Sequence, residues 1–123
     1  MRIEEAAQAT GLSADTIRFY ERSGMLPKIA RDARGWREFS KSDIDWLTTL
    51  ERLRTTGMPL ASVRAFAASA QGPAAETPAE QAVRLSLLQD HAKTLADRRA
   101  KLDACEAYLQ SKINTYTNLL EHS

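Results

Sequence analysis

Residues 7–39 read AQATGLSADTIRFYERSGMLPKIARDARGWREF, and this stretch decides the fold. Its first half carries the signals of two short helices that meet at a tight turn. Thr10-Gly11 ends the first helix, and Ser13 is a good N-cap for the second. Asp15 lies in the first turn of the second helix, where a negative charge opposes the positive helix end. A helix-turn-helix is therefore predicted near the start of the chain.

The side chains around the turn suit this arrangement. Gly11 tolerates the positive φ that the turn needs, and Ala7 leaves room for the second helix to cross the first. Ile17 would fill the space between the two helices. The exposed start of the second helix could then enter the major groove of DNA as a recognition helix, with Thr16 and Arg18 facing the groove.

The second half of the stretch has no helical period and is typical of a short β-hairpin with its tip at residues 32–35. Arginines surround one tryptophan in this hairpin, and we interpret it as a wing that clamps DNA phosphates. The alternative is an ordinary basic loop whose tryptophan covers the next helix. Tyr20 also has two interpretations, a DNA contact through its hydroxyl or a core residue. The wing residues are Arg31, Arg34, Trp36 and Arg37.

The charge distribution supports a nucleic-acid partner although the formal net charge is only +1. Residues 16–41 hold seven cations and three anions, whereas residues 73–123 hold six cations and seven anions. Basic charge is thus concentrated at one end of the chain, as a duplex-binding surface requires. No segment approaches membrane-spanning length and no apolar signal core begins the chain, so a cytoplasmic location is expected.

Two further helices are expected before a linker. Ser40 and Asp43 are spaced as a capping box, and the apolar residues that follow repeat at helical spacing up to Gly57. Pro59 suits the first turn of a fourth helix, which runs to Ala70. Residues 71–76 form a short linker containing Gly72-Pro73. We expect one domain at 1–72 and a second element at 77–121.

A single long helix is predicted after the linker. Thr77, Pro78 and Glu80 combine an N-cap, a first-turn proline and a capping-box glutamate. No glycine or proline follows, so the helix runs for about 40 residues, roughly 60 Å at 1.5 Å per residue. Its apolar residues recur every seven positions, as in a coiled-coil seam. The proposed dimerisation residues are Leu88, Leu95, Arg99, Leu102, Glu106, Leu109, Ile113 and Tyr116.

The partner of this helix is expected to be a second copy of the chain. A helix this long buries too little against a domain of about 70 residues, although folding back on that domain is the alternative. In an antiparallel pair centred near Leu102-Asp103, each Arg99 would face Glu106 of the other chain, whereas a parallel pair would bring like charges together. The predicted fold is mainly α, a winged helix-turn-helix followed by a long antiparallel coiled-coil dimerisation helix.

Residues 3–70 resemble the DNA-binding domain of the MerR family of bacterial transcription regulators. The resemblance lies in the helix-turn-helix residues, in the block Arg18-Phe19-Tyr20-Glu21 and in the wing motif Gly35-Trp36-Arg37 that follows. It continues through the long helix. Trp36 and Phe39 stand where the family commonly has tyrosines. The resemblance implies that Phe19 belongs to the recognition helix and that Arg54 belongs to a second element that contacts phosphates.

The resemblance also implies a mechanism. Such dimers bind a palindrome in an overlong promoter spacer, and an effector makes them bend and untwist the DNA so that RNA polymerase engages both promoter elements. The expected partners are double-stranded promoter DNA, a second copy of the chain, RNA polymerase indirectly and a small-molecule effector. The DNA-contact candidates are Ser13, Thr16, Arg18, Phe19, Tyr20, Arg31, Arg34, Trp36, Arg37 and Arg54.

The single cysteine limits the chemistry of the effector. Cys105 excludes a disulfide within the chain, and metal-sensing relatives carry a cysteine pair that is missing here. We therefore expect no metal site and no cofactor, and a small organic or reactive compound as effector. Cys105 is a candidate redox sensor beside the seam, although a lone helical cysteine is more often a small apolar residue. The competing function is an effector-independent, excisionase-like DNA-bending protein; an enzyme is not expected, because no nucleophile–base pair can be assembled.

Overall fold

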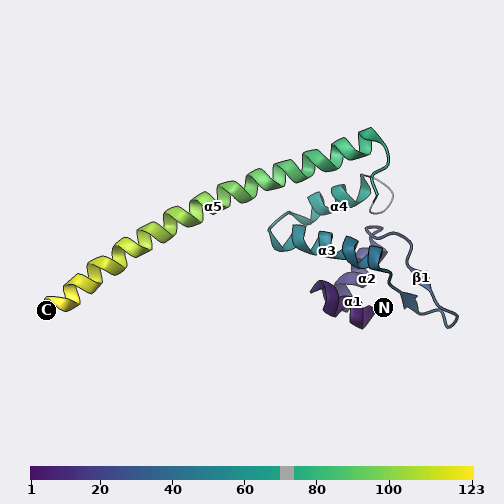
Figure 1. Ribbon diagram of the computed structural model, residues 1–123, viewed down its shortest axis with the longest axis horizontal. Helices are drawn as coiled ribbons and strands as arrows, with labels where there is room; N and C mark the ends of the chain where they lie inside the picture. Colours follow the sequence, from purple (N-terminus) through teal and green to yellow (C-terminus); the bar gives the residue numbers. More distant parts are fainter. Residues whose placement is uncertain (70–73) are drawn as a thin grey trace. The chain divides into compact units, whose positions relative to one another are not determined.

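The computed structural model describes residues 1–69 and 74–123 of the chain, and it is mainly helical as predicted (Figure 1). The expected linker at Gly72-Pro73 and the expected helix end at Ala70 lie outside the described residues. The elements in order are α1 (Ile3–Thr10), α2 (Ala14–Arg22), β1 (Ala30–Arg31), β2 (Arg37–Glu38), α3 (Lys41–Thr55), α4 (Leu60–Ala68) and α5 (Pro78–Glu121).

The chain divides into two compact units, Met1–Leu88 and Gln89–Ser123. The first unit contains α1 to α4, the hairpin and the first turns of α5. The base of the long helix therefore belongs with the elements that precede it. The domain boundaries at 1–72 and 77–121 remain predictions.

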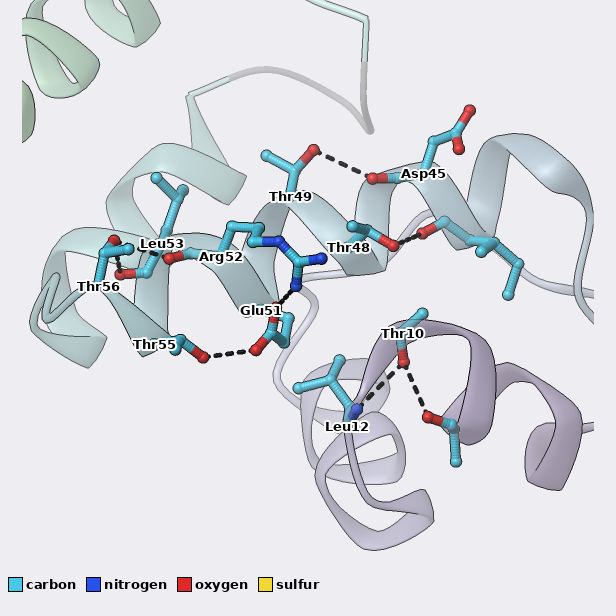
Figure 2. A network of polar contacts seen from close by, with 12 residues as sticks. Thr10, Leu12, Asp45, Thr48, Thr49, Glu51, Arg52, Leu53, Thr55 and Thr56 are labelled. Carbon is cyan, nitrogen blue, oxygen red and sulfur yellow. Dashed lines mark hydrogen bonds and ion pairs between the residues drawn. The ribbon is translucent and has the colours of Figure 1, made fainter.

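The helix-turn-helix forms through the local signals that predicted it. Gly11 adopts φ 81° and its N–H donates to the Ala7 carbonyl at 3.0 Å, which ends α1. The Ser13 hydroxyl then accepts the Thr16 N–H at 3.1 Å and begins α2. In Figure 2 the Thr10 hydroxyl lies at the end of α1, where it donates to the Ala6 carbonyl and accepts the Leu12 N–H. The turn is thus held by its own short-range hydrogen bonds.

The third helix starts and ends as predicted, and the fourth begins directly after Pro59, which is its N-cap residue. Ser40 and Asp43 form the capping box, and Gly57 has φ 95° at the turn between α3 and α4. Figure 2 shows threonines along α3 whose hydroxyls return to backbone carbonyls one turn earlier, as Thr48 does to Ile44 at 2.8 Å. Near the end of the helix, Glu51 holds the side chains of Arg52 and Thr55.

One apolar core joins these elements in the first unit. It consists of side chains from α1 to α4 and from the segments on either side of the hairpin. Ile17, Leu47, Leu50 and Val63 are its largest fully buried members. Ile17 therefore fills the space between the helices, as the sequence predicted. Burying such aliphatic side chains contributes about 1.5–3 kcal/mol each.

The second unit is the remainder of α5, where Leu95 is half-buried and the large apolar side chains from Leu102 onward are exposed in the single chain. The helix begins at the predicted capping box, where Thr77 and Glu80 exchange hydrogen bonds of 3.0 and 3.1 Å. Beyond Leu88, seven large apolar residues are more than half exposed: Leu102, Tyr108, Leu109, Ile113, Tyr116, Leu119 and Leu120. Leu102, at the centre of the predicted seam, is 69% exposed.

Candidate nucleic-acid interface

The recognition helix α2 has one face in the core and one face in solvent. Ile17 and Tyr20 are buried, whereas Asp15, Arg18 and Arg22 lie on the outer side. The Arg18 guanidinium donates to the Asp15 carboxylate at 3.0 Å, and 40% of its side chain is accessible. An ion pair this exposed contributes little to stability, so Arg18 can exchange Asp15 for a phosphate or a base edge at small cost.

The wing is an antiparallel hairpin that places two arginines opposite each other. Ala30 pairs with Glu38, and Arg31 pairs with Arg37. Like charges directly opposite across a strand pair are destabilising. Arg31 donates to the Gly35 carbonyl at 2.8 Å, and Arg37 binds Glu21 of α2. These acceptors offset the repulsion between Arg31 and Arg37, and a bound phosphate would offset it further.

The Glu21–Arg37 pair ties the wing to the recognition helix. Both nitrogens of the Arg37 guanidinium that face Glu21 approach one carboxylate oxygen, at 2.9 and 2.8 Å. Both side chains are about one quarter accessible, which shields the pair from full solvent screening. The pair therefore links the wing to α2 in the free protein.

Recognition helix and wing together enclose a cavity of about 320 Å³, which we call the basic hollow. It brings together Arg18 from α2 with all four wing residues predicted from the sequence. Glu4 is its one acidic residue, so the lining is strongly positive. The lining residues are Arg2, Ile3, Glu4, Arg18, Arg31, Arg34, Gly35, Trp36 and Arg37. A concave surface with five arginines suits the phosphate backbone of a duplex.

Arg2 is a residue of the basic hollow that sequence reasoning missed. Its guanidinium lies 5.4 Å from the centre of the Trp36 ring and 2.5 Å from the Asp32 carboxylate. Trp36 is 60% exposed, which excludes the alternative in which its ring covers the third helix. Only the tertiary fold brings Arg2 to the wing, and a single arginine near the start of the chain gives no local signal of that contact.

The structure decides between the two interpretations of Tyr20. Its side chain is 3% exposed and belongs to the core, which favours the packing interpretation over a direct DNA contact. Burial raises the pKa of the Tyr20 hydroxyl, while Arg54 lowers it and Glu51 raises it. The hydroxyl is therefore protonated throughout the physiological range.

Phe19 lies beside the core instead of projecting freely from α2. It packs against the buried cluster, and the Arg64 guanidinium of α4 lies 5.4 Å from its ring centre. Arg64 also donates to the Ser23 hydroxyl at 3.4 Å. Arg64 is a second cation next to α2 that the sequence did not single out. Phe19 is better placed to position α2 than to read bases.

The remaining candidates do not line the basic hollow. Ser13 and Thr16 cap the start of α2 and hydrogen-bond to each other at 2.9 Å. Arg54 lies at the end of α3, where it donates to the Met58 carbonyl at 3.1 Å and fixes the turn at Gly57. Its exposed position by that turn matches the expected second phosphate-contacting element, which remains a prediction.

The tip of the wing depends on the charge of Asp32. Its carboxylate accepts the Arg34 and Trp36 N–H groups at 2.8 and 3.0 Å. Desolvation raises the pKa of Asp32, but hydrogen bonds from Arg2, Trp36 and Arg34 outweigh it and the pKa is lowered. A carboxylate with a lowered pKa stabilises the fold above its unfolded value near pH 3.9, and this contribution is lost as the pH falls through the folded value.

We therefore expect Asp32→Asn to be less stable than the parent at pH 7, and the difference to shrink as the pH falls below the unfolded value near 3.9. Urea unfolding of both proteins across this range measures the difference. Asp90→Asn, which changes an exposed carboxylate on α5, is the control and should give parallel curves. A difference between Asp32→Asn and the parent that persists unchanged at pH 3 would contradict the assigned role of the charge.

The remaining predictions concern Cys105, metal binding and membrane-spanning segments. Cys105 is exposed and free. Among residues 1–69 and 74–123, no group of three or more His, Cys, Asp or Glu side chains is arranged to hold a metal ion. Within the same residues, none of the helices has the length and apolar character needed to span a bilayer.

Comparison with known sequences matches the region that contains the helix-turn-helix and the wing. The family model of MerR HTH family regulatory proteins matches residues 1–70, more than half of the chain. A helix-turn-helix transcriptional regulator of Haemophilus influenzae is 44% identical over 63 residues, which cover 51% of this chain and 47% of the relative. The regulator YyaN of Bacillus subtilis is 26% identical over 127 residues, covering 97% of this chain and 92% of YyaN. The first of these matches thus spans about half of the relative.

Solved structures agree over nearly the whole chain. A regulator from Listeria monocytogenes assigned to the MerR family has a TM-score of 0.81 at 30% identity, covering 94% of this chain and 85% of its own. HiNmlR, described as a MerR family regulator that lacks the sensor domain and is bound to promoter DNA, has a TM-score of 0.77 at 35% identity. That match covers 95% of this chain and 90% of HiNmlR. The chain belongs to the MerR family of DNA-binding helix-turn-helix transcription regulators.

Proposed function

We propose that the protein binds an inverted repeat in a promoter as a homodimer and regulates transcription there. The basic hollow carries this proposal, because it joins the recognition helix and the wing in one positive surface before DNA is present. HiNmlR, which this chain resembles over almost its full length, was solved on promoter DNA without a sensor domain. That likeness supports promoter binding by the region described here, in the cytoplasm where the DNA lies.

The exposed seam of α5 supports a second copy as the partner. Leu102, Leu109 and Tyr116 are each at least 60% exposed and repeat every seven residues. A 44-residue helix with a stripe of large exposed apolar side chains is stabilised when another surface covers that stripe. An antiparallel pair is the proposed arrangement, because it places Arg99 of each chain against Glu106 of the other. The predicted seam positions Leu88 and Leu95 would extend the contact toward the base of the helix.

We propose that the regulation responds to a small organic or reactive compound instead of a metal ion. A single chain has only one cysteine and so cannot by itself supply the thiolate pair that soft metal ions prefer. Cys105 is exposed beside the seam, where oxidation or alkylation would disturb dimer packing, so it is the candidate sensor. RNA polymerase would respond through the changed shape of the promoter.

Selection from a randomised duplex pool tests the promoter-binding proposal. We expect the purified protein to enrich an inverted repeat, and in vitro transcription from a promoter carrying that repeat in its spacer to change with spacer length. Enrichment of sequences without two-fold symmetry would overturn the proposal. Bending of the selected duplex with no effect on transcription would favour the effector-independent, excisionase-like alternative.

A further inference from the structure

Arg84 is a buried cation at the base of α5, in the same compact unit as α3 and α4. Its side chain is 7% exposed. The guanidinium lies 4.9 Å from the ring centre of Trp46 in α3 and 5.1 Å from that of Phe66 in α4. These two rings stack on each other, with centres 5.7 Å apart and planes inclined by 18°. Arg84 therefore contacts two helices that lie far from it in the sequence.

Directional hydrogen bonds accompany the stacking. Arg84 Nε donates to the Phe66 carbonyl at 3.3 Å and to the Ser69 hydroxyl at 3.0 Å. Both acceptors belong to the C-terminal end of α4, where the Ser69 hydroxyl also donates to the Phe66 carbonyl. A cation at this position interacts favourably with the negative end of the helix dipole. Arg84 thus caps α4 from a different helix.

Burying the Arg84 guanidinium beside the Trp46 and Phe66 rings costs desolvation free energy. Desolvation lowers the pKa of Arg84, and Glu80 acts in the opposite direction, yet arginine stays charged at any physiological pH. An apolar side chain of similar volume would pack there without the desolvation penalty. A cavity of about 310 Å³ lies beside the rings, so packing alone leaves α5 room to shift. The planar, hydrogen-bonded guanidinium removes that freedom.

The stack also reaches the end of the recognition helix. Trp46 Nε1 donates to the Met25 carbonyl at 2.9 Å, and this bond is buried. Met25 follows directly after the Ser23-Gly24 turn that ends α2. A contiguous chain of contacts therefore runs from Arg84 through Trp46 to the segment that holds α2 in place.

We propose that Arg84 is a positioning residue that holds the base of α5 in one orientation on α3 and α4, and so sets the half-site spacing that the dimer accepts. This inference rests on the proposed dimeric binding of an inverted repeat. In such a dimer two heads, each formed by residues 1–69, are joined through α5. The orientation at each helix base then decides how far apart the two recognition helices lie.

Arg84→Met tests this role, with Lys93→Met as a matched control that removes an exposed cation from the same helix. We measure affinity for a single half-site, for the selected inverted repeat and for repeats whose spacer is changed by two base pairs. The parent should strongly prefer one spacing. Arg84→Met should keep the dimer and its half-site affinity, while its preference for that spacing falls about tenfold. Lys93→Met should match the parent.

The outcomes separate this inference from the proposed function. If the parent does not prefer the inverted repeat to a half-site, the proposed function fails and the inference fails with it. If the parent shows the preference and folded Arg84→Met retains it in full, Arg84 is merely structural and only the inference is overturned. Should Arg84→Met unfold, Arg84→Lys decides, because it keeps the charge over the rings without the planar fork. We expect it to lose part of the spacing preference, and full retention would overturn the inference.

Discussion

Leu102→Asp is expected to convert the proposed dimer into a monomer. With Arg99 facing Glu106 of the other chain, the predicted antiparallel pair is centred between Leu102 and Asp103, so the substitution places one new carboxylate from each chain in the apolar seam beside the two-fold axis. Each desolvated charge without a partner costs several kcal/mol. The dimer dissociation constant should therefore rise by at least about a thousandfold. Sedimentation equilibrium at micromolar concentration measures the change directly.

Loss of the dimer should also weaken binding to the inverted repeat. Two linked heads bind with an effective local concentration near the millimolar range, and a monomer loses this advantage. We expect the affinity for the repeat to fall by about a hundredfold, while the affinity for a single half-site is retained. Ala104→Asp adds the same charge two residues away, outside the seam, and should remain dimeric. A dimeric Leu102→Asp protein would show that the seam is misplaced.

Arg18→Ala is expected to lower the affinity for DNA by about ten- to a hundredfold without changing the fold. Truncation of one arginine that contacts a phosphate or a base edge costs about 1–3 kcal/mol. Arg18 is the only residue of α2 in the lining of the basic hollow, whereas its partner in the free protein is the exposed Asp15. The core residues of α2 stay in place, so thermal unfolding should be unchanged. Fluorescence anisotropy with the selected duplex measures the affinity.

The salt dependence of DNA binding distinguishes a phosphate contact of Arg18 from a base contact. If Arg18 binds a phosphate, the slope of log K against log salt should fall by about one in Arg18→Ala. If it reads a base, the preference at one position of each half-site should relax instead. Arg22→Ala is the matched control, because Arg22 lies on the outer side of the same helix but outside the basic hollow. Equal affinities of Arg18→Ala and the parent would remove α2 from the interface.

Local signals made most of the fold predictable from the sequence. Ser13, Ser40 and Thr77 begin helices because their hydroxyls satisfy backbone N–H groups only a few residues away. Gly11 and Gly57 end helices because they tolerate positive φ. Such signals do not depend on the rest of the molecule. The helix boundaries and the hairpin tip were therefore within reach of pattern and spacing.

The contacts that orient these elements could not be predicted in the same way. Arg2 meets Asp32 and Trp36, and Arg84 meets Trp46, only because the fold brings distant segments together. A lone arginine in a sequence indicates neither its partner nor its burial. Tyr20 was ambiguous for a related reason, since a tyrosine on the inner face of a short helix can still expose its hydroxyl. Its 3% exposure resolves the position in favour of packing.

The stoichiometry of the complex with DNA tests the central claim most directly. Native mass spectrometry of the protein with the selected inverted repeat should show two chains on one duplex, with the one-chain complex nearly absent even when DNA is in excess. A duplex carrying one half-site serves as the comparison. A single chain bound to the full repeat, with no preference for it over the half-site duplex, would contradict the account.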